Sequence, residues 1–82
     1  MPEILRRNGW KMHFYATDGK ERPHIHCRKG EKNGKFFLLQ SSKEIIHSNS
    51  YNMNNKDISE VLEIVNENYH FILEKWEKYF KL

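Results

Sequence analysis

Residues 58–80 read ISEVLEIVNENYHFILEKWEKYF, and this stretch decides the fold. Its apolar residues recur at steps of three and four from Ile58 to Phe80, which is the spacing of one face of an α-helix. Asn54 or Asn55 can cap the start, because an asparagine side chain accepts hydrogen bonds from the free backbone N–H groups of the first turn. We therefore expect one long C-terminal helix with a single apolar face.

The segments before this helix are patterned for short strands. WKMHFYA at 10–16 alternates apolar and polar residues, and HIHCRK at 24–29 alternates with the same period of two. KFFLLQ at 35–40 is apolar on both faces, and a shorter strand is expected at 44–48, followed by a polar connection at 48–55. Asp-Gly and Asn-Gly dipeptides mark turns between the first three strands.

These elements predict an α+β fold, a small antiparallel sheet of three to four strands packed on one long C-terminal helix, in a single domain of residues 1–82. The residues expected on the inner face, against the helix, are Trp10, Met12, Phe14, Ile25 and Cys27. The residues expected on the outer face are Lys11, His13, Tyr15, His24, His26 and Arg28. If the first two strands pair as a hairpin, these six outer side chains cluster.

Composition and charge limit the classes of protein to which this chain can belong. The chain is 38% hydrophobic and 30% charged, which is a globular composition. The single cysteine excludes an internal disulfide and a four-cysteine zinc site. The sequence also has neither a signal-peptide pattern nor an apolar run long enough to span a membrane. We therefore expect a cytoplasmic protein. Residues 1–35 hold nine Lys and Arg against four Asp and Glu, while the remainder holds five against seven. This basic half suits an anionic partner such as nucleic acid, a phosphorylated ligand or an acidic protein. Since the excess is small, ordinary solubilising charge explains it equally well.

The His-x-His pair on the second strand is compatible with a metal ion. Two imidazoles on one strand face can share zinc, but a site needs a third ligand. The candidates are His13, Asp18 and His47, and no spacing selects one of them. We therefore assign no metal ligand and expect no cofactor, with metal binding through His24 and His26 as an alternative hypothesis.

The same face is compatible with metal-independent RNA cleavage. His24 and His26 are the catalytic candidates, because an imidazole can act as general acid or base near neutral pH. The candidates for holding the scissile phosphate are Lys11, Arg22 and Arg28, and Tyr15 could orient the 2′-hydroxyl or stack on a base. These residue types serve a plain phosphate-binding surface equally well, so enzyme activity is left open.

A binding module without chemistry is the third hypothesis. The outer face, with His13 among its contact residues, would then dock RNA or a protein, and aromatic and Arg residues are typical of interfaces. The two-sided apolar third strand suggests a cover for the outer face, for which a second copy in a homodimer is one candidate.

Four ordered motifs resemble the bacterial domain-of-unknown-function 4160 family. They are PEILR at 2–6, RPHIH at 22–26, KFFL at 35–38 and EKWEKYF at 74–80, so the resemblance covers nearly the whole chain. His24 and His26 match the histidine pair of the family's Pro-Pro-His-hydrophobic-His core. The chain departs from the family pattern at Arg22, which stands for the first proline, and at Cys27, which stands for valine. His13 looks like a local replacement of an aromatic or aliphatic residue.

The resemblance implies a small bacterial protein that often stands beside a second small gene. We therefore expect a component of a toxin–antitoxin-like module that binds a cognate small protein encoded nearby, or RNA, and no membrane. A small ribonuclease toxin and a metal-binding protein are the alternatives.

Overall fold

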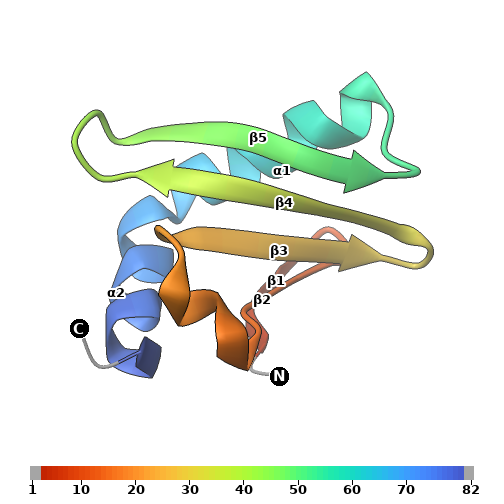
Figure 1. Cartoon of the computed structure of the whole chain (residues 1–82). Coiled ribbons are helices and arrows are strands. Elements are labelled where there is room, and N and C mark those ends of the chain that lie inside the picture. Colours follow the sequence, from red (N-terminus) through yellow and green to blue (C-terminus); the bar gives the residue numbers. More distant parts are fainter. Residues whose placement is uncertain (1–2, 81–82) are drawn as a thin grey trace.

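The computed structural model describes residues 3–80, and within this range five antiparallel strands form one sheet in the order β1-β2-β3-β4-β5 (Figure 1). The strands are β1 (Glu3–Arg7), β2 (Trp10–His13), β3 (His24–Lys29), β4 (Lys32–Leu39) and β5 (Glu44–Tyr51). The helices are a 3-10 helix, η1 (Ala16–Lys20), and two α-helices, α1 (Asn55–Glu67) and α2 (Tyr69–Phe80). The expected α+β class is confirmed. Residues 1–2 and 81–82 of the expected domain, with Pro2 of the PEILR motif, lie outside the described range.

The prediction of three to four strands is wrong, because β1 was missed. It pairs with β2 through a turn at Asn8 and Gly9, whose φ angles are 51° and 84°. Left-handed φ at both turn residues is what the tightest β-hairpins require, and Asn-Gly is their preferred dipeptide. β5 also continues to Tyr51 rather than ending near residue 48, since its polar second half is held by pairing with β4.

The prediction of one long helix is also wrong, because the helix is interrupted at Asn68. The backbone there departs from helical geometry, with φ −116° and ψ 20°, and the Asn68 side-chain amide donates to the Ile64 carbonyl at 2.8 Å. Asparagine competes with helical backbone bonding in this way. The interruption lets α2 change direction, so that it reaches the end of the sheet that carries η1 (Figure 1).

The core lies between the two α-helices and one face of the sheet. All five residues of the expected inner set are fully buried there, with Ile72 and Trp76 of α2 among the residues that enclose them. Trp10 also donates its indole N–H to the Glu60 carboxylate at 2.7 Å, which ties β2 to α1. The expected cap is confirmed at Asn54, whose side chain accepts from the Asp57 N–H at 2.8 Å.

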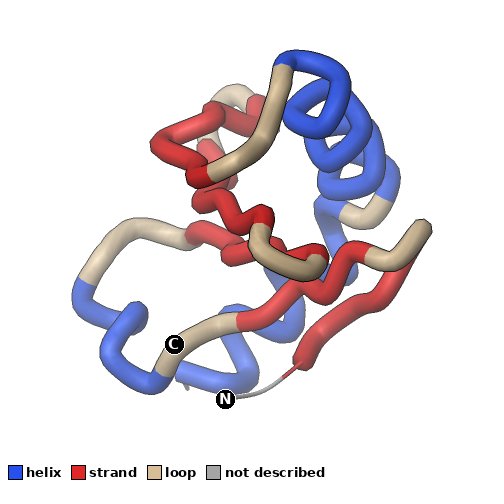
Figure 2. The backbone as a smooth tube through the Cα atoms, turned by 90° about the vertical axis from the view of Figure 1, so that its right-hand side faces the viewer, coloured by secondary structure: helices blue, strands red, loops and turns tan. Residues whose placement is uncertain are grey.

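The opposite sheet face, called the outer face below, is open except at one end. Register places Lys11 opposite Arg28 and His13 opposite His26, as the expected hairpin between these strands requires. η1, which replaces the expected turn after the first strand, folds over this face on the side away from α1 (Figure 2). His13 and His24 lie on the outer face as expected, but η1 buries both of them. No helix among residues 3–80 is long and apolar enough to span a bilayer.

Candidate functional site

Asp18 is the residue through which η1 contacts the sheet. Its Oδ2 accepts a hydrogen bond from the Tyr15 backbone N–H at 2.8 Å, and its own N–H donates to the Tyr15 carbonyl at 3.0 Å. This reciprocal pair fixes the turn and points the carboxylate inward. Asp18 is only 5% exposed, which is unusual for an ionisable carboxylate unless partners surround it.

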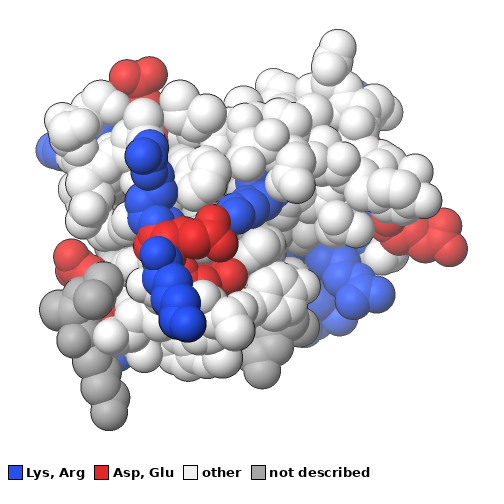
Figure 3. Space-filling model, in the orientation of Figure 1, with Lys and Arg blue, Asp and Glu red and all other residues white. Residues whose placement is uncertain are grey.

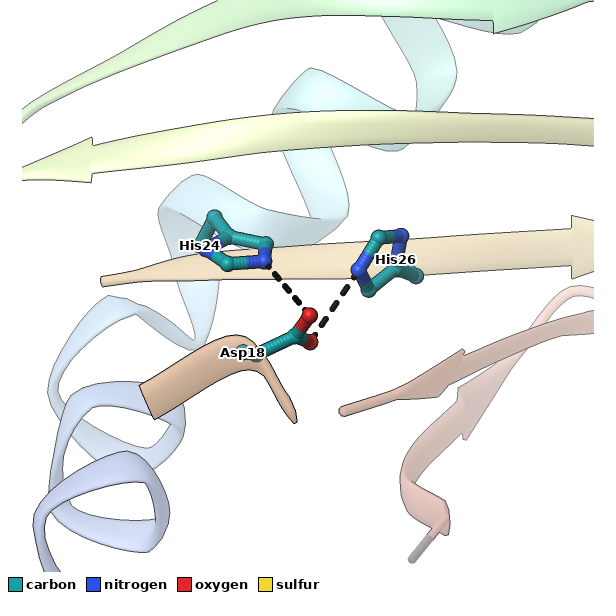
Figure 4. A group of neighbouring side chains, drawn as sticks. All are labelled: Asp18, His24 and His26. Atoms are coloured by element: carbon teal, nitrogen blue, oxygen red, sulfur yellow. Dashed lines mark hydrogen bonds and ion pairs between the residues drawn. The ribbon is translucent and has the colours of Figure 1, made fainter. Parts of the chain in front are cut away.

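The partners of Asp18 are the two histidines of the His-x-His pair. The Nε2 atom of His24 lies 3.2 Å from Oδ1, and the Nε2 atom of His26 lies 3.1 Å from Oδ2. Both rings reach from β3 toward the carboxylate on η1 (Figure 4). Strand alternation places the two histidines on one face, and η1 supplies the third group, so one carboxylate bridges two imidazoles.

The tautomer of His24 follows from its other contact. Its Nδ1 lies 2.8 Å from the Arg22 carbonyl oxygen, and since a carbonyl only accepts, Nδ1 must carry the proton that it donates. Nε2 is buried and has no hydrogen bond of acceptable geometry to any group within residues 3–80, although Asp18 Oδ1 lies nearby. In the neutral ring, this Nε2 therefore presents a lone pair to a carboxylate.

Aromatic rings enclose the cluster. The His13 ring stacks on His26 with centroids 5.7 Å apart, and Tyr15 meets His26 edge-on at 4.6 Å. On the other side, His24 lies 5.1 Å from the ring of Trp76. Burial lowers the pKa of both His13 and His26, and the Asp18 carboxylate opposes this shift at each ring. Burial thus favours neutral rings at these two positions.

An open hollow of about 480 Å³ extends from His26 across β4 to β5 on the outer face. Its walls include Tyr15, Arg28, Lys35 and Tyr51. A second hollow of about 430 Å³ adjoins it at His13 and Arg28 and is lined by Lys11 and Lys29 as well. Figure 3 views this face and shows basic side chains in two groups, one beside η1 and one toward the end of β3, with uncharged surface between them.

The structure brings together most of the residues that the sequence singled out. His13, Tyr15, His26 and Arg28 line the first hollow, and Lys11 lies beside Arg28 in the second. His24 is fully buried next to the hollow, so its ring has no direct access to a ligand. Arg22 is exposed and lines neither hollow; its carbonyl, rather than its guanidinium, takes part in the site.

Sequence reasoning missed several residues of the hollow, among them Lys35 and Tyr51. Lys35 lies opposite His26 in the β3–β4 register. The expected Asn-Gly turn is wrong here, because Asn33 and Gly34 pair within β4 and the chain turns at Gly30 and Glu31 instead. Tyr51 falls in the segment expected to be an irregular connection, and it carried no readable strand signal. Of the three candidate third ligands, Asp18 is the one that the fold places against the histidine pair, whereas His47 lies on β5 and contacts Ser50 at 3.0 Å.

Comparison with known proteins identifies a family but no activity. The family model described as Domain of unknown function (DUF4160) matches residues 9–77, a range that includes both histidines of the pair. The chain therefore belongs to this family, and the resemblance drawn from its motifs is confirmed. No curated protein and no solved structure matches the chain.

Proposed function

We propose that this member of the family binds single-stranded RNA on the outer face of its sheet. The observation that carries the proposal is the open hollow over β3, β4 and β5, which combines exposed tyrosines with basic side chains. Single-stranded RNA is recognised by stacking its unpaired bases on aromatic rings while cations contact its phosphates.

The stacking groups are Tyr15 and Tyr51, at two edges of the hollow. Tyr51 is 64% exposed and Tyr15 is 44% exposed, so both present ring surface without rearrangement. Tyr15 is already held by its contacts with His13 and His26, which makes it the more rigid platform. A tyrosine loses little conformational entropy when it becomes ordered, so such rings are effective contact residues.

The phosphate-binding groups are Arg28 and Lys11, which are paired across β2 and β3. Both side chains are exposed, and Arg28 lines both hollows. Lys35 also lines the first hollow, but its ammonium bonds the Glu21 carboxylate at 2.8 Å, so RNA would compete with this ion pair. We therefore assign the main electrostatic contribution to Arg28 and Lys11.

The test measures binding of a fluorescein-labelled 12-nucleotide RNA by anisotropy at several salt concentrations. The Lys11→Gln, Arg28→Gln double variant should bind more weakly and should reduce the salt slope by about 1.4, because each phosphate contact on a single strand contributes about 0.7. The matched control is Lys56→Gln, Lys78→Gln, which removes the same charge from exposed positions on the α-helices. Equal slopes for the two double variants would exclude binding through the outer face.

We propose further that RNA binding serves a toxin–antitoxin-like module, for which the support is the family resemblance. Induced expression of the wild type should then change bacterial growth, and the Lys11→Gln, Arg28→Gln variant should lose the effect. Purification with the product of the neighbouring gene tests the expected protein partner. The catalytic role of His24 and His26 stays a prediction, and the burial of His24 leaves His26 as the ring that lines the hollow.

A further inference from the structure

We infer that Asp18, His24 and His26 form a binding site for one divalent transition-metal ion, with Zn²⁺ as the best match. This inference goes beyond RNA binding and does not depend on it. It rests on the geometry of a buried carboxylate and two imidazoles whose ligand atoms all lie within 4.8 Å of one another.

The first step concerns the two atoms that face each other across the cluster. The Nδ1 proton of His24 is committed to the Arg22 carbonyl, so the neutral ring directs the Nε2 lone pair at Asp18 Oδ1, 3.2 Å away. Two electron-rich atoms at this distance repel each other, and burial removes the water that would screen them. A positive charge between them removes the conflict, and either a proton on Nε2 or a metal ion supplies it.

The second step concerns the third ligand. His26 Nε2 lies 3.1 Å from Asp18 Oδ2, on the same side of the carboxylate as His24 (Figure 4). Without metal, this contact is a hydrogen bond from Nε2. Binding of an ion requires the neutral His26 ring to change tautomer. Its proton then lies on Nδ1, the Nε2 lone pair coordinates the metal, and no other group needs to accept the proton. An ion about 2.1 Å from each ligand then requires shifts of roughly 1 Å or less.

The groups around the ligands are those that stabilise metal sites. The His24 Nδ1–H donates to a backbone carbonyl, which is the usual arrangement behind a ligating histidine, and the Tyr15 N–H donates to the Asp18 carboxylate. The rings of Trp76 and Tyr15 provide a low-polarity surround. Hydrogen bonds to the backbone thus orient His24 and Asp18, two of the three ligands, before any ion binds.

The ligand set selects the class of ion. Two imidazoles with one carboxylate suit Zn²⁺, Fe²⁺ and similar ions, whereas Ca²⁺ and Mg²⁺ prefer oxygen ligands. Three protein ligands leave a coordination position free. His26 lines the hollow whereas His24 is buried, so the open position lies toward the His26 side of the cluster. An ion here would also link η1 to β3 and so stabilise the fold of a domain whose core is small.

The test titrates untagged full-length protein, first stripped with a chelator, with Co²⁺ and then Zn²⁺. We expect one Co²⁺ per chain, with visible absorption bands that Zn²⁺ abolishes, and a higher melting temperature in Zn²⁺ that chelator reverses. Asp18→Asn and His26→Gln should each raise the Kd about 100-fold or more, since loss of an outer partner alone costs about 10- to 100-fold. His26 is chosen over His24 because its side chain is 18% exposed and its replacement is less disruptive to the core.

The control variant is His47→Gln, which removes a histidine that lies on β5 and bonds Ser50. It should bind Co²⁺ as the wild type does. The inference is overturned if the wild type takes up no Co²⁺ at about 1 mM, if Asp18→Asn and His26→Gln bind it as well as the wild type, or if His47→Gln alone abolishes uptake. Circular dichroism of each variant distinguishes a lost ligand from a lost fold.

Discussion

Replacement of Tyr51 by alanine separates RNA stacking from fold stability. The Tyr51 side chain is 64% exposed at the end of β5, so its loss should change the free energy of unfolding by no more than about 0.5 kcal/mol. One base stacked on an aromatic ring contributes about 1–3 kcal/mol, so the RNA Kd should rise about 5- to 150-fold.

The matched control is Tyr79→Ala. Tyr79 is 41% exposed on α2 and does not line the hollows of the outer face, so its loss should leave the RNA Kd within about twofold. Anisotropy with the 12-nucleotide RNA gives the Kd, and urea denaturation gives the free energy of unfolding. An unchanged Kd for Tyr51→Ala, or an equal loss for both variants, would refute stacking on this edge of the hollow.

Three further predictions concern the frame that holds the site. Glu60→Ala should lower the free energy of unfolding by about 2 kcal/mol in urea denaturation, because it leaves the Trp10 indole N–H without its carboxylate acceptor. The control Glu63→Ala, on the exposed side of α1, should leave this free energy nearly unchanged. Asn54→Ala should cost about 1 kcal/mol in the same assay, since it removes the side-chain cap of α1. Burial raises the pKa of the Cys27 thiol to about 12. Cys27 should therefore react with a thiol reagent at pH 8 only after denaturant is added. Rapid reaction of the native protein would show that the core opens.

The fold was predictable where residue pattern and burial agree. Alternation along residues 10–16 and 24–29 placed Trp10, Met12 and Cys27 in the core, because strand period and hydrophobicity indicate the same face. The interruption at Asn68 was not predictable from the apolar pattern, since the apolar stripe continues through it. Its cause is a local side-chain bond to the Ile64 carbonyl.

The candidate site was predictable in part. The His-x-His pair and its position on a strand face could be read directly, as could Asp18 among three candidate third ligands. Asp18 is selected because η1 folds back over the sheet. This is a tertiary contact, and no repeating pattern of residues in the sequence indicates it. The same fold-back buries His24, and no feature of the strand alternation distinguishes His24 from the more exposed His26.

The most direct test of RNA binding on the outer face is an NMR titration of isotope-labelled protein with the 12-nucleotide RNA. We predict that backbone amide shifts concentrate in β2, β3, β4 and the second half of β5, around Lys11, Arg28 and Tyr51, with little change in α1 and α2. Shifts concentrated on the two α-helices, or no shifts at millimolar RNA, would contradict the account.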